Sequence, residues 1–427
     1  MTGELTDAGA RTRRLVPLIA LLSGHGLSLA GNAITAVVVP LYVLHDTGSV
    51  LATGVAGVFA TVPMFVGGAL GGVLVDRFGF RRAAIAADVS SGVTVLAIPI
   101  LAATIGLPFW ALLLLVFVSG LLDTPGNTAK ASLIPDLAEI GGVQLTRATA
   151  AAGAISRSAT MIGASIAAIA VVGLGPLNAL VLDAVTFAVS ALLLRGGVPR
   201  TSSGGGPATV IEPAGNFWRE LKDGVRYLSS TPIIRNLVIL IVITNCLDAA
   251  GMLVLKPVYA RTISPDGALF GVMVACFAFG ALSGAGLFGW FGHRLPRRAT
   301  LVVCFVLAGP PPYVAMALDL PVPALLTVFV LAGLSAGSIN PLLDALLYEK
   351  IPRNMRARVL GALTTGVTAG MPIGSVLGAL VVSQAGLLPA LVSVAVIYGL
   401  VTLAPLVGGS WRGLEATRPE PSRAEGS

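Results

Sequence analysis

Pairs of polar residues recur at helical spacing inside long apolar stretches of this chain. Asp123 and Asn127 lie four residues apart, as do Asn340 and Asp344, so each pair falls on one face of a helix. Ionisable groups inside apolar spanning helices are costly and usually belong to a substrate or proton pathway. These pairs could therefore bind a polar group of a substrate or carry a proton.

Two more apolar stretches hold polar pairs. One stretch contains His25 and Asn32, and the other contains Asn245 and Asp248. We expect Arg157 to be the ion-pair partner of Asp123, since an adjacent opposite charge keeps a carboxylate ionised. Asp248 has only Lys256 as a basic residue in its neighbourhood, two turns away, and is the better candidate for a proton carrier. A structural ion pair is the alternative for Asp123, and helix packing is the alternative for His25.

Other chemistries lack the residues that they require. The sequence has no His/Cys cluster with metal-ligand spacing, no nucleophile–base pattern and no glycine-rich phosphate loop followed by Lys-Ser/Thr. Cys246, Cys276 and Cys304 fall in apolar helices and are interpreted as small buried hydrophobes. We therefore expect no metal, no cofactor and no enzyme activity, and any pumping must draw on an ion gradient.

The elements that position these residues are membrane-spanning helices. Of the 427 residues, 55% are hydrophobic and only 11% are charged, and the mean hydropathy is +0.90. A spanning helix needs roughly 20 mostly apolar residues. Twelve such stretches are predicted: Leu15–Leu44, Val50–Val75, Ala83–Thr104, Pro108–Ala129, Ala148–Val172, Pro176–Leu194, Asn236–Val258, Leu269–Gly292, Ala299–Leu318, Val322–Leu347, Val359–Ser383 and Leu387–Val407.

The chain also repeats itself. A shift of 217 positions superposes Pro40 on Pro257 and Gly54 on Gly271, with further matches at Tyr42, Gly67, Arg81 and Gly120. Duplicated helical halves are common in transporters, with the substrate site between them. We predict an all-α membrane protein of two six-helix bundles related by a pseudo-two-fold axis. Its parts are an N-terminal bundle (1–195), a linker with an amphipathic helix (196–234), a C-terminal bundle (235–410) and a disordered tail (411–427).

Charge placement predicts the topology. The net charge is +7, and all but Arg157, Lys256 and Arg261 of the 27 Lys and Arg are assigned to the two tails or to loops on one side. By the positive-inside rule, both termini are cytoplasmic and the protein is a multi-pass protein of the inner (plasma) membrane. Because the basic residues are dispersed, nucleic-acid binding is not expected.

Glycine residues predict one close helix contact. Gly366, Gly370, Gly374 and Gly378 recur at four-residue spacing. Small residues in this register let helix backbones approach each other in lipid. We expect this helix to pack tightly against a neighbour, and the second span is the candidate.

The loop after the second span carries a recognisable motif. It reads Gly72-Val-Leu-Val-Asp76-Arg77-Phe-Gly79-Phe-Arg81-Arg82. This resembles the signature loop of the major facilitator superfamily, with Phe80 where a basic residue is usual. The resemblance covers essentially the whole chain. We predict that Asp76 meets the positive N-terminus of the eleventh helix and, with the arginines, latches the outward-facing form.

Within that superfamily, the chain resembles drug-efflux and secretion proteins, including macrolide and siderophore exporters. The supporting stretches include Leu133-Ile134-Pro135, Asp183-Ala-Val-Thr-Phe187 and Leu255-Lys256-Pro257-Val258-Tyr259-Ala260. The resemblance implies that helices one, four, seven and ten line a central cavity, which places all four polar pairs there.

The expected function is export of a hydrophobic or amphipathic small molecule by alternating access. The expected partners are that substrate, protons as the coupling ion and the lipid bilayer, with the chain acting as a monomer. Proton-coupled import of a nutrient and a non-transporting membrane sensor remain alternatives. Helix five reads Ile162-Gly-Ala-Ser165 where many exporters have Gly-Pro, and helix four lacks the arginine of many proton-coupled drug antiporters. These two departures leave the direction and the coupling open.

Overall fold

The structure is a computed structural model that describes residues 2–199, 226, 232–264, 267–291, 296–351 and 356–406. Within these ranges the secondary structure is entirely helical. The predicted amphipathic helix of the linker, apart from residue 226, and the predicted disordered tail lie outside the described residues.

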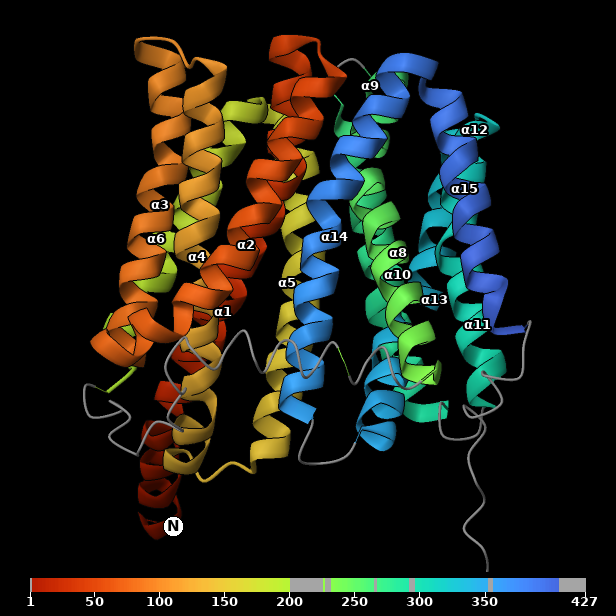
Figure 1. The fold of residues 1–427 in the computed structure, drawn as a ribbon. Coiled ribbons are helices and arrows are strands. Elements are labelled where there is room, and N and C mark those ends of the chain that lie inside the picture. Colours follow the sequence, from red (N-terminus) through yellow and green to blue (C-terminus); the bar gives the residue numbers. More distant parts are fainter. Residues whose placement is uncertain are drawn as a thin grey trace, which may run out of the picture.

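The first half contains six helices (Figure 1). They are α1 (Thr2–Thr47), α2 (Val50–Phe78), α3 (Phe80–Thr104), α4 (Phe109–Ile140), α5 (Leu145–Leu174) and α6 (Pro176–Gly197). We call the end of the bundle where α1 begins the near end. The end where α1 finishes and α2 begins is the far end.

The second half contains the same number of spans in more pieces, because its first and third spans are irregular. Its elements are α8 (Pro232–Ala250), the π-helix η1 (Gly251–Leu255), α9 (Lys256–Ile263), α10 (Ala268–Phe291), α11 (Arg297–Ala308), α12 (Pro310–Ala317), α13 (Val322–Lys350), α14 (Arg356–Ala385), α15 (Leu387–Leu403) and the 3-10 turn η3 (Ala404–Leu406). Helices α8, η1 and α9 form one continuous span.

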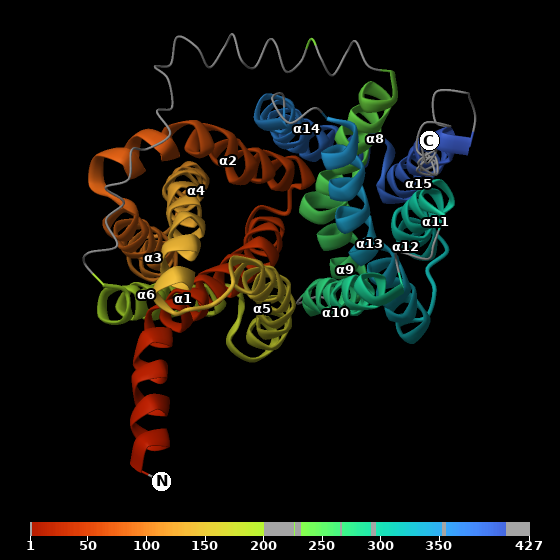
Figure 2. The ribbon, with the colours of Figure 1, turned by 90° about the horizontal axis from the view of Figure 1, so that it is seen from below.

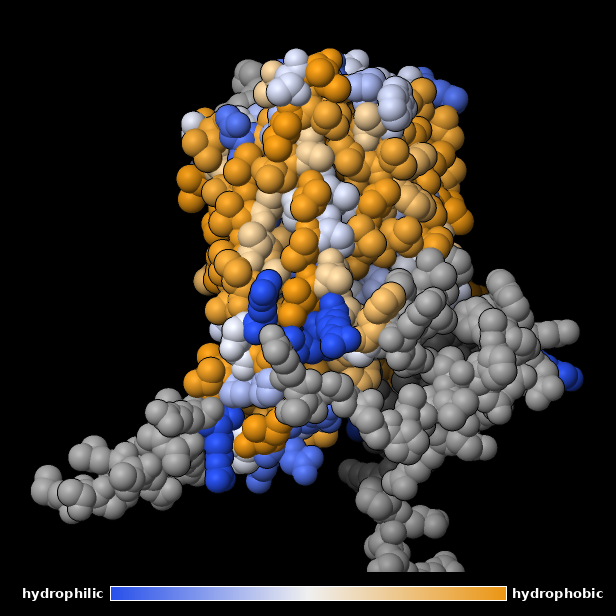
Figure 3. Space-filling model, turned by 90° about the vertical axis from the view of Figure 1, so that its left-hand side faces the viewer, coloured by the Kyte–Doolittle hydropathy of each residue, from blue (hydrophilic) through white to orange (hydrophobic). Residues whose placement is uncertain are grey.

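The two halves stand side by side with their helices running between the near and far ends (Figures 1 and 2). Eleven stretches of the described chain are long and apolar enough to cross a membrane, and α2, which contains the apolar run Val50–Met64, takes the remaining position. The side surface is a broad apolar belt with hydrophilic residues gathered toward the near end (Figure 3). The prediction of an all-α membrane fold with two bundles is confirmed.

Helix α4 is longer than predicted, and this changes the position of one charge. The predicted span ended at Ala129, which placed Lys130 in a near-end loop. The helix instead continues to Ile140, and Lys130 is buried inside the bundle at 1% exposure. The prediction was wrong because the partner that makes burial of a lysine tolerable, Asp88, lies 42 residues away in sequence.

The repeat has a structural counterpart at the near end. Arg81 donates hydrogen bonds to the carbonyls of Val198 (2.8 Å) and Arg195 (2.6 Å), at the end of α6. Its copy Arg298 donates to the carbonyl of Pro405 (2.8 Å and 3.0 Å), at the end of the last span. The last carbonyls of a helix have no partner within that helix. In each half, the same arginine therefore ties the end of the sixth span to the start of the third.

The glycine stripe of α14 packs against α8, whereas we had expected the second span. A Cβ at Gly374 would overlap the backbone of Cys246, and one at Gly378 would press on Ala250. Helix α2 meets another face of α14, where Gly54 lies against Ala379. Helix α14 therefore packs against the second span, as expected, but through a different face from the glycine stripe, which lies on α8. The spacing of the glycines shows that one face of this helix lacks side chains, but it does not show which neighbouring helix packs against that face.

The two halves touch through repeated positions near the far end. Gly54 of α2 lies against Ala379 of α14, and its copy Gly271 of α10 lies against Ala168 of α5. The guanidinium of Arg261 in α9 also donates a hydrogen bond to the carbonyl of Leu44, in the last turn of α1. A cation suits the carbonyl end of a helix. These contacts join the halves at the far end.

A Gly374→Ala substitution tests the packing of α14 on α8. We expect a loss of stability of about 1–3 kcal/mol, because overpacking at a tight contact displaces backbone. Thermal unfolding of the purified protein in detergent would measure it. Gly366→Ala is the matched control, since its Cβ would meet only a Val242 methyl carbon at 3.7 Å. Equal melting temperatures for the two variants would contradict this packing.

Candidate functional site

A polar stripe on α1 organises the first half. Ser28, Asn32 and Thr35 recur at intervals of four and three residues, so they share one helix face. Each donates a hydrogen bond to a different carboxylate: Ser28 to Asp88 of α3, Asn32 to Asp123 of α4, and Thr35 to Asp183 of α6. The stripe therefore connects α1 to three other helices of its bundle.

Asp123 is bound by two amides. Asn32 Nδ2 lies 2.9 Å and Asn127 Nδ2 lies 2.8 Å from the same carboxylate oxygen, Oδ2. The structure thus brings three predicted site residues together. Arg157, the predicted partner, is instead exposed and makes no ion pair with Asp123. That expectation was wrong because the amides of two neighbouring side chains already donate hydrogen bonds to Asp123. The position of a residue along a predicted span does not show which side chains surround it.

The ion pair between Asp88 and Lys130 was missed at the sequence level. The Lys130 ammonium lies 2.6 Å from Asp88 Oδ1, and Ser190 donates a hydrogen bond to Asp88 Oδ2 at 2.6 Å. Both charged side chains are 1% exposed. A buried charge needs both a counter-charge and hydrogen bonds, and this group has them. Its partners are satisfied, so it serves to hold α3, α4 and α6 together.

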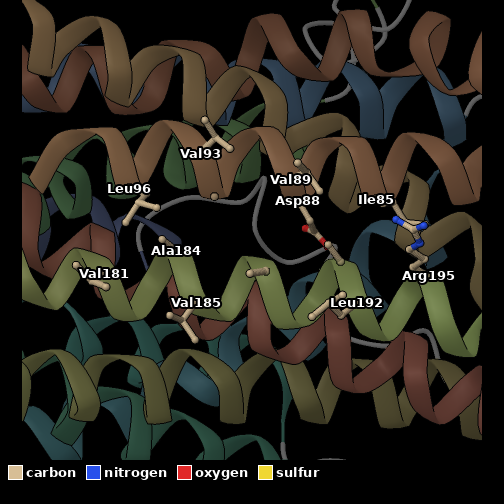
Figure 4. Close-up of a pocket in the computed structure, with 13 residues that line it drawn as sticks. Ile85, Asp88, Val89, Val93, Leu96, Val181, Ala184, Val185, Leu192 and Arg195 are labelled. Carbon is tan, nitrogen blue, oxygen red and sulfur yellow. The ribbon is translucent and has the colours of Figure 1, made fainter. Parts of the chain in front are cut away.

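The floor of a surface groove lies over this ion pair. The groove, of about 530 Å³, runs between α3 and α6, with Asp88 at its floor and Arg195 near one end (Figure 4). Most of its lining is apolar, including Val89, Val93 and Val185. Because Asp88 is fully engaged, the groove offers little chemistry for recognising a polar substrate.

Two polar atoms of the predicted first-half site remain unsatisfied. Among the described residues, His25 Nδ1 and Asn127 Oδ1 are buried without a hydrogen-bond partner. Buried polar groups are normally paired. These atoms are therefore the places in the first half where a water molecule, a proton or a substrate group would gain a partner.

The second half contains a cavity that collects the other predicted residues. It has a volume of about 350 Å³ and is lined by Asn245 and Asp248 of α8, Asn340 of α13 and Lys256 of α9, together with aromatic and aliphatic side chains. Asp248 and Asn340 are exposed within it. Asn245 turns its amide to the carbonyl of Ile241 at 2.9 Å, and so the amide of Asn340 is the freer of the two.

Asp248 is held by one hydroxyl. Tyr398 Oη lies 3.3 Å from Asp248 Oδ2, and among the described residues no Lys, Arg or His nitrogen lies within 4.0 Å of the carboxyl. Asp248 therefore differs from Asp88 and Asp123, which have two or more donors each. It keeps acceptor capacity open toward the cavity.

Two glycines make room for the tyrosines that support this site. A Cβ at Gly309, in the break between α11 and α12, would overlap the Tyr398 ring, and one at Gly251 would overlap the Tyr313 hydroxyl. The rings of Tyr313 and Tyr398 lie with centroids 6.4 Å apart. The Gly-Pro-Pro-Pro sequence at 309–312 thus breaks the ninth span where Tyr398 must pass. Sequence analysis missed both tyrosines, although this proline run was a visible signal.

Several predicted residues belong to the signature loop or to the near end of α13. The side chains of Asp344, Gly72, Asp76 and Arg77 lie outside the described residues. Gly79 separates α2 from α3, and Arg82 is exposed at the near end. The gating role of this motif therefore stays a prediction, and the described hydrogen bonds of Arg81 run to the end of α6.

Comparison with known proteins identifies the family. The family model of the Major Facilitator Superfamily matches residues 21–261 and again residues 238–427. The chain belongs to this superfamily and is a multi-pass membrane transporter of small molecules.

Curated relatives narrow the likeness. Multidrug efflux pump Tap of Mycolicibacterium fortuitum is 28% identical over 375 residues, covering 87% of this chain and 90% of that protein. Its namesake in Mycobacterium tuberculosis (strain ATCC 25618 / H37Rv) is 26% identical and covers 87% of this chain and 88% of its own. Macrolide efflux protein A of Streptococcus pyogenes is 25% identical, and the match covers 85% of this chain and 89% of that protein. The predicted resemblance to drug-efflux members is confirmed.

Solved structures agree on the fold alone. The nucleoside transporter NupG has a TM-score of 0.71 at 11% identity, covering 93% of this chain and 98% of that chain. A D-xylose-proton symporter has a TM-score of 0.67 at 15% identity, and the match covers 91% of this chain and 95% of that chain.

Substitution of Lys130 tests the buried ion pair. Lys130→Met should cost about 3–5 kcal/mol, because it leaves the Asp88 carboxylate buried without its counter-charge. The double variant Asp88→Asn, Lys130→Met should recover most of that loss, since it removes both charges. Thermal unfolding in detergent, with folded yield after size-exclusion chromatography, measures both. A double variant no more stable than Lys130→Met would show that the pair is not the source of the effect.

Proposed function

We propose that this protein is a proton-coupled exporter of hydrophobic or amphipathic small molecules, with Asp248 as the coupling acid. The observation that carries the proposal is the cavity of the second half. There, a carboxyl with one hydrogen bond from the described residues faces a space walled by Phe277, Phe305, Phe329 and Tyr398. Apolar walls with a few placed polar groups are typical of small-molecule sites.

Names of the relatives support the direction of transport. Three of them are called efflux pumps or an efflux protein, and each match covers more than four-fifths of this chain. The sequence offers no nucleotide-binding loop, so the free energy comes from an ion gradient. A protonatable side chain that faces a membrane cavity is the usual means of such coupling.

The proposed topology places the near end in the cytoplasm of a bacterial cell. Hydrophilic residues gather at this end, and exposed arginines such as Arg82, Arg147 and Arg235 lie there. The positive-inside rule assigns such an end to the cytoplasm. The far-end contacts between the halves then seal the outer side, and the exporter alternates by breaking them. We propose that one chain is the working unit.

Asp248→Asn tests the proposed function. Expressed in an efflux-deficient bacterium, the wild type should raise the minimum inhibitory concentrations of amphipathic antibiotics, including a macrolide. Asp248→Asn should return them to the level of the empty vector, because the amide cannot exchange a proton. Asp136→Asn, an exposed carboxyl at the near end of α4, should keep full resistance.

Everted vesicles supply the second readout. Wild-type vesicles should accumulate the antibiotic when energised, and collapse of the pH gradient with nigericin should stop accumulation. Accumulation that survives nigericin, or full resistance in the Asp248→Asn strain, would refute the coupling role of Asp248. Uptake by intact cells in place of accumulation by everted vesicles would identify an importer.

Arg261→Ala tests the far-end contact as part of alternating access. Without the bond to the Leu44 carbonyl, the far-end-open form should become more populated. Spin labels at His45 and Ile263, in a background with its three cysteines replaced by alanine, report the far-end distance. The distribution should shift to longer distances in Arg261→Ala, while Arg235→Ala, at the near end, should leave it as in the parent. An unchanged distribution would exclude a latch at this position.

A further inference from the structure

The cavity of the second half contains a positive charge as well as Asp248. Lys256 begins α9 and lines the same space. Its ammonium lies over three aromatic rings: 5.6 Å from the centroid of Phe329, 5.7 Å from that of Phe277 and 5.8 Å from that of Tyr313. A cation over aromatic faces is attracted by the negative charge of the ring centre.

The π-helix η1 places the two charges on one face. Lys256 follows Asp248 by eight positions, and a regular α-helix would turn Lys256 about 80° away over that interval. Each π-type bond spans one more residue than an α-type bond. The five residues of η1 absorb that excess, so Lys256 returns to the face of Asp248. Such π-segments often occur at functional sites.

The ammonium of Lys256 is incompletely satisfied by the protein. It makes no hydrogen bond to any part of the chain that the structure describes, and no carboxylate lies within 4.0 Å. Cation–π contacts offset only part of the free-energy cost of removing an ammonium from water. The three rings therefore hold the cation beside the cavity, and its N–H donors have no hydrogen-bond acceptor among the described residues.

Asp248 and Lys256 form no direct ion pair, although each charge lies within electrostatic range of the other. No nitrogen–oxygen pair between them lies within 4.0 Å, and their backbone positions are about two helical turns apart. A cavity with an available carboxylate at one point and an available ammonium at another is complementary to a molecule with the opposite pair of charges. Apolar side chains and the amide of Asn340 line the same cavity.

We propose that Lys256 is a binding subsite for an acidic group of the substrate, a carboxylate or an acidic phenol or enol. Together with Asp248, it selects amphipathic molecules that carry both an acid and an amine. This inference rests on the proposed function and names the substrate class of the same cavity. Asp248 alone would give a preference for cationic substrates. With Lys256 in the same cavity, the preference is for substrates that carry a cation and an acidic group.

The test uses matched acid and ester ligands. Rhodamine B carries a cation and a free carboxylate, and its ethyl ester carries only the cation. Two amphipathic amine antibiotics with free carboxylates, each paired with its methyl ester, complete the panel. Binding to the purified full-length protein in detergent is measured by fluorescence anisotropy for the dyes and by competition for the others.

The wild type should bind at least one acid about tenfold more tightly than its ester, because the ester cannot pair with Lys256. In Lys256→Gln, the ratio of acid to ester affinity should fall to about one. Lys256→Arg should restore the preference, since a guanidinium keeps the charge and stacks on aromatic rings. Thermal unfolding of the variants confirms that each is folded, and the Lys256→Arg variant keeps the test valid if Lys256→Gln is unstable.

The proposal is overturned if no acid in the panel is preferred by the wild type, or if Lys256→Gln weakens acid and ester by the same factor. The second result would make Lys256 a structural cation. Everted-vesicle transport separates this outcome from failure of the proposed function. Transport without an acid preference would leave the exporter and reject the subsite, whereas acid-selective binding without transport would keep the subsite and reject the exporter.

Discussion

The membrane interior supplies no hydrogen-bond partners, and this constraint governs the placement of the polar side chains described within the membrane-spanning helices. The first half meets it by internal pairing. One stripe of α1 donates to carboxylates on α3, α4 and α6, and Lys130 neutralises Asp88. Each bond joins two helices that lipid alone would not hold together, because apolar burial gives no driving force between helices in lipid.

The second half meets the same constraint differently. The repeat places Phe305 and Leu347 where the first half has Asp88 and Lys130, so two buried apolar side chains replace the two charges of the ion pair. Such a replacement is often neutral or stabilising. The charges of the second half, Asp248 and Lys256, instead face a cavity. The two halves thus differ in the use of these charges: Asp88 and Lys130 pair between helices of the first half, whereas Asp248 and Lys256 line a cavity of the second half.

Irregular backbone is also concentrated in the second half. The π-helix η1 rotates Lys256 into the cavity, and the break at Gly309 makes room for Tyr398, the hydroxyl donor to Asp248. Regular helices would have left both charges on different faces and the tyrosine obstructed. The first-half helices, by contrast, run unbroken through their spans. Among the described spans, the π-helix and the break between two helices therefore fall in spans that line the proposed site.

The sequence by itself determined the twelve spans, the repeat, the superfamily and the four polar pairs, because hydropathy and helical spacing are local properties. Tertiary structure decided the partners. It gave Asp123 two amides in place of Arg157, buried Lys130 against Asp88, and packed the glycine stripe of α14 on α8. Such contacts depend on the rotation and depth of helices far apart in sequence. A π-helical turn such as η1 changes which side chains share a helix face, and the hydropathy pattern does not show it.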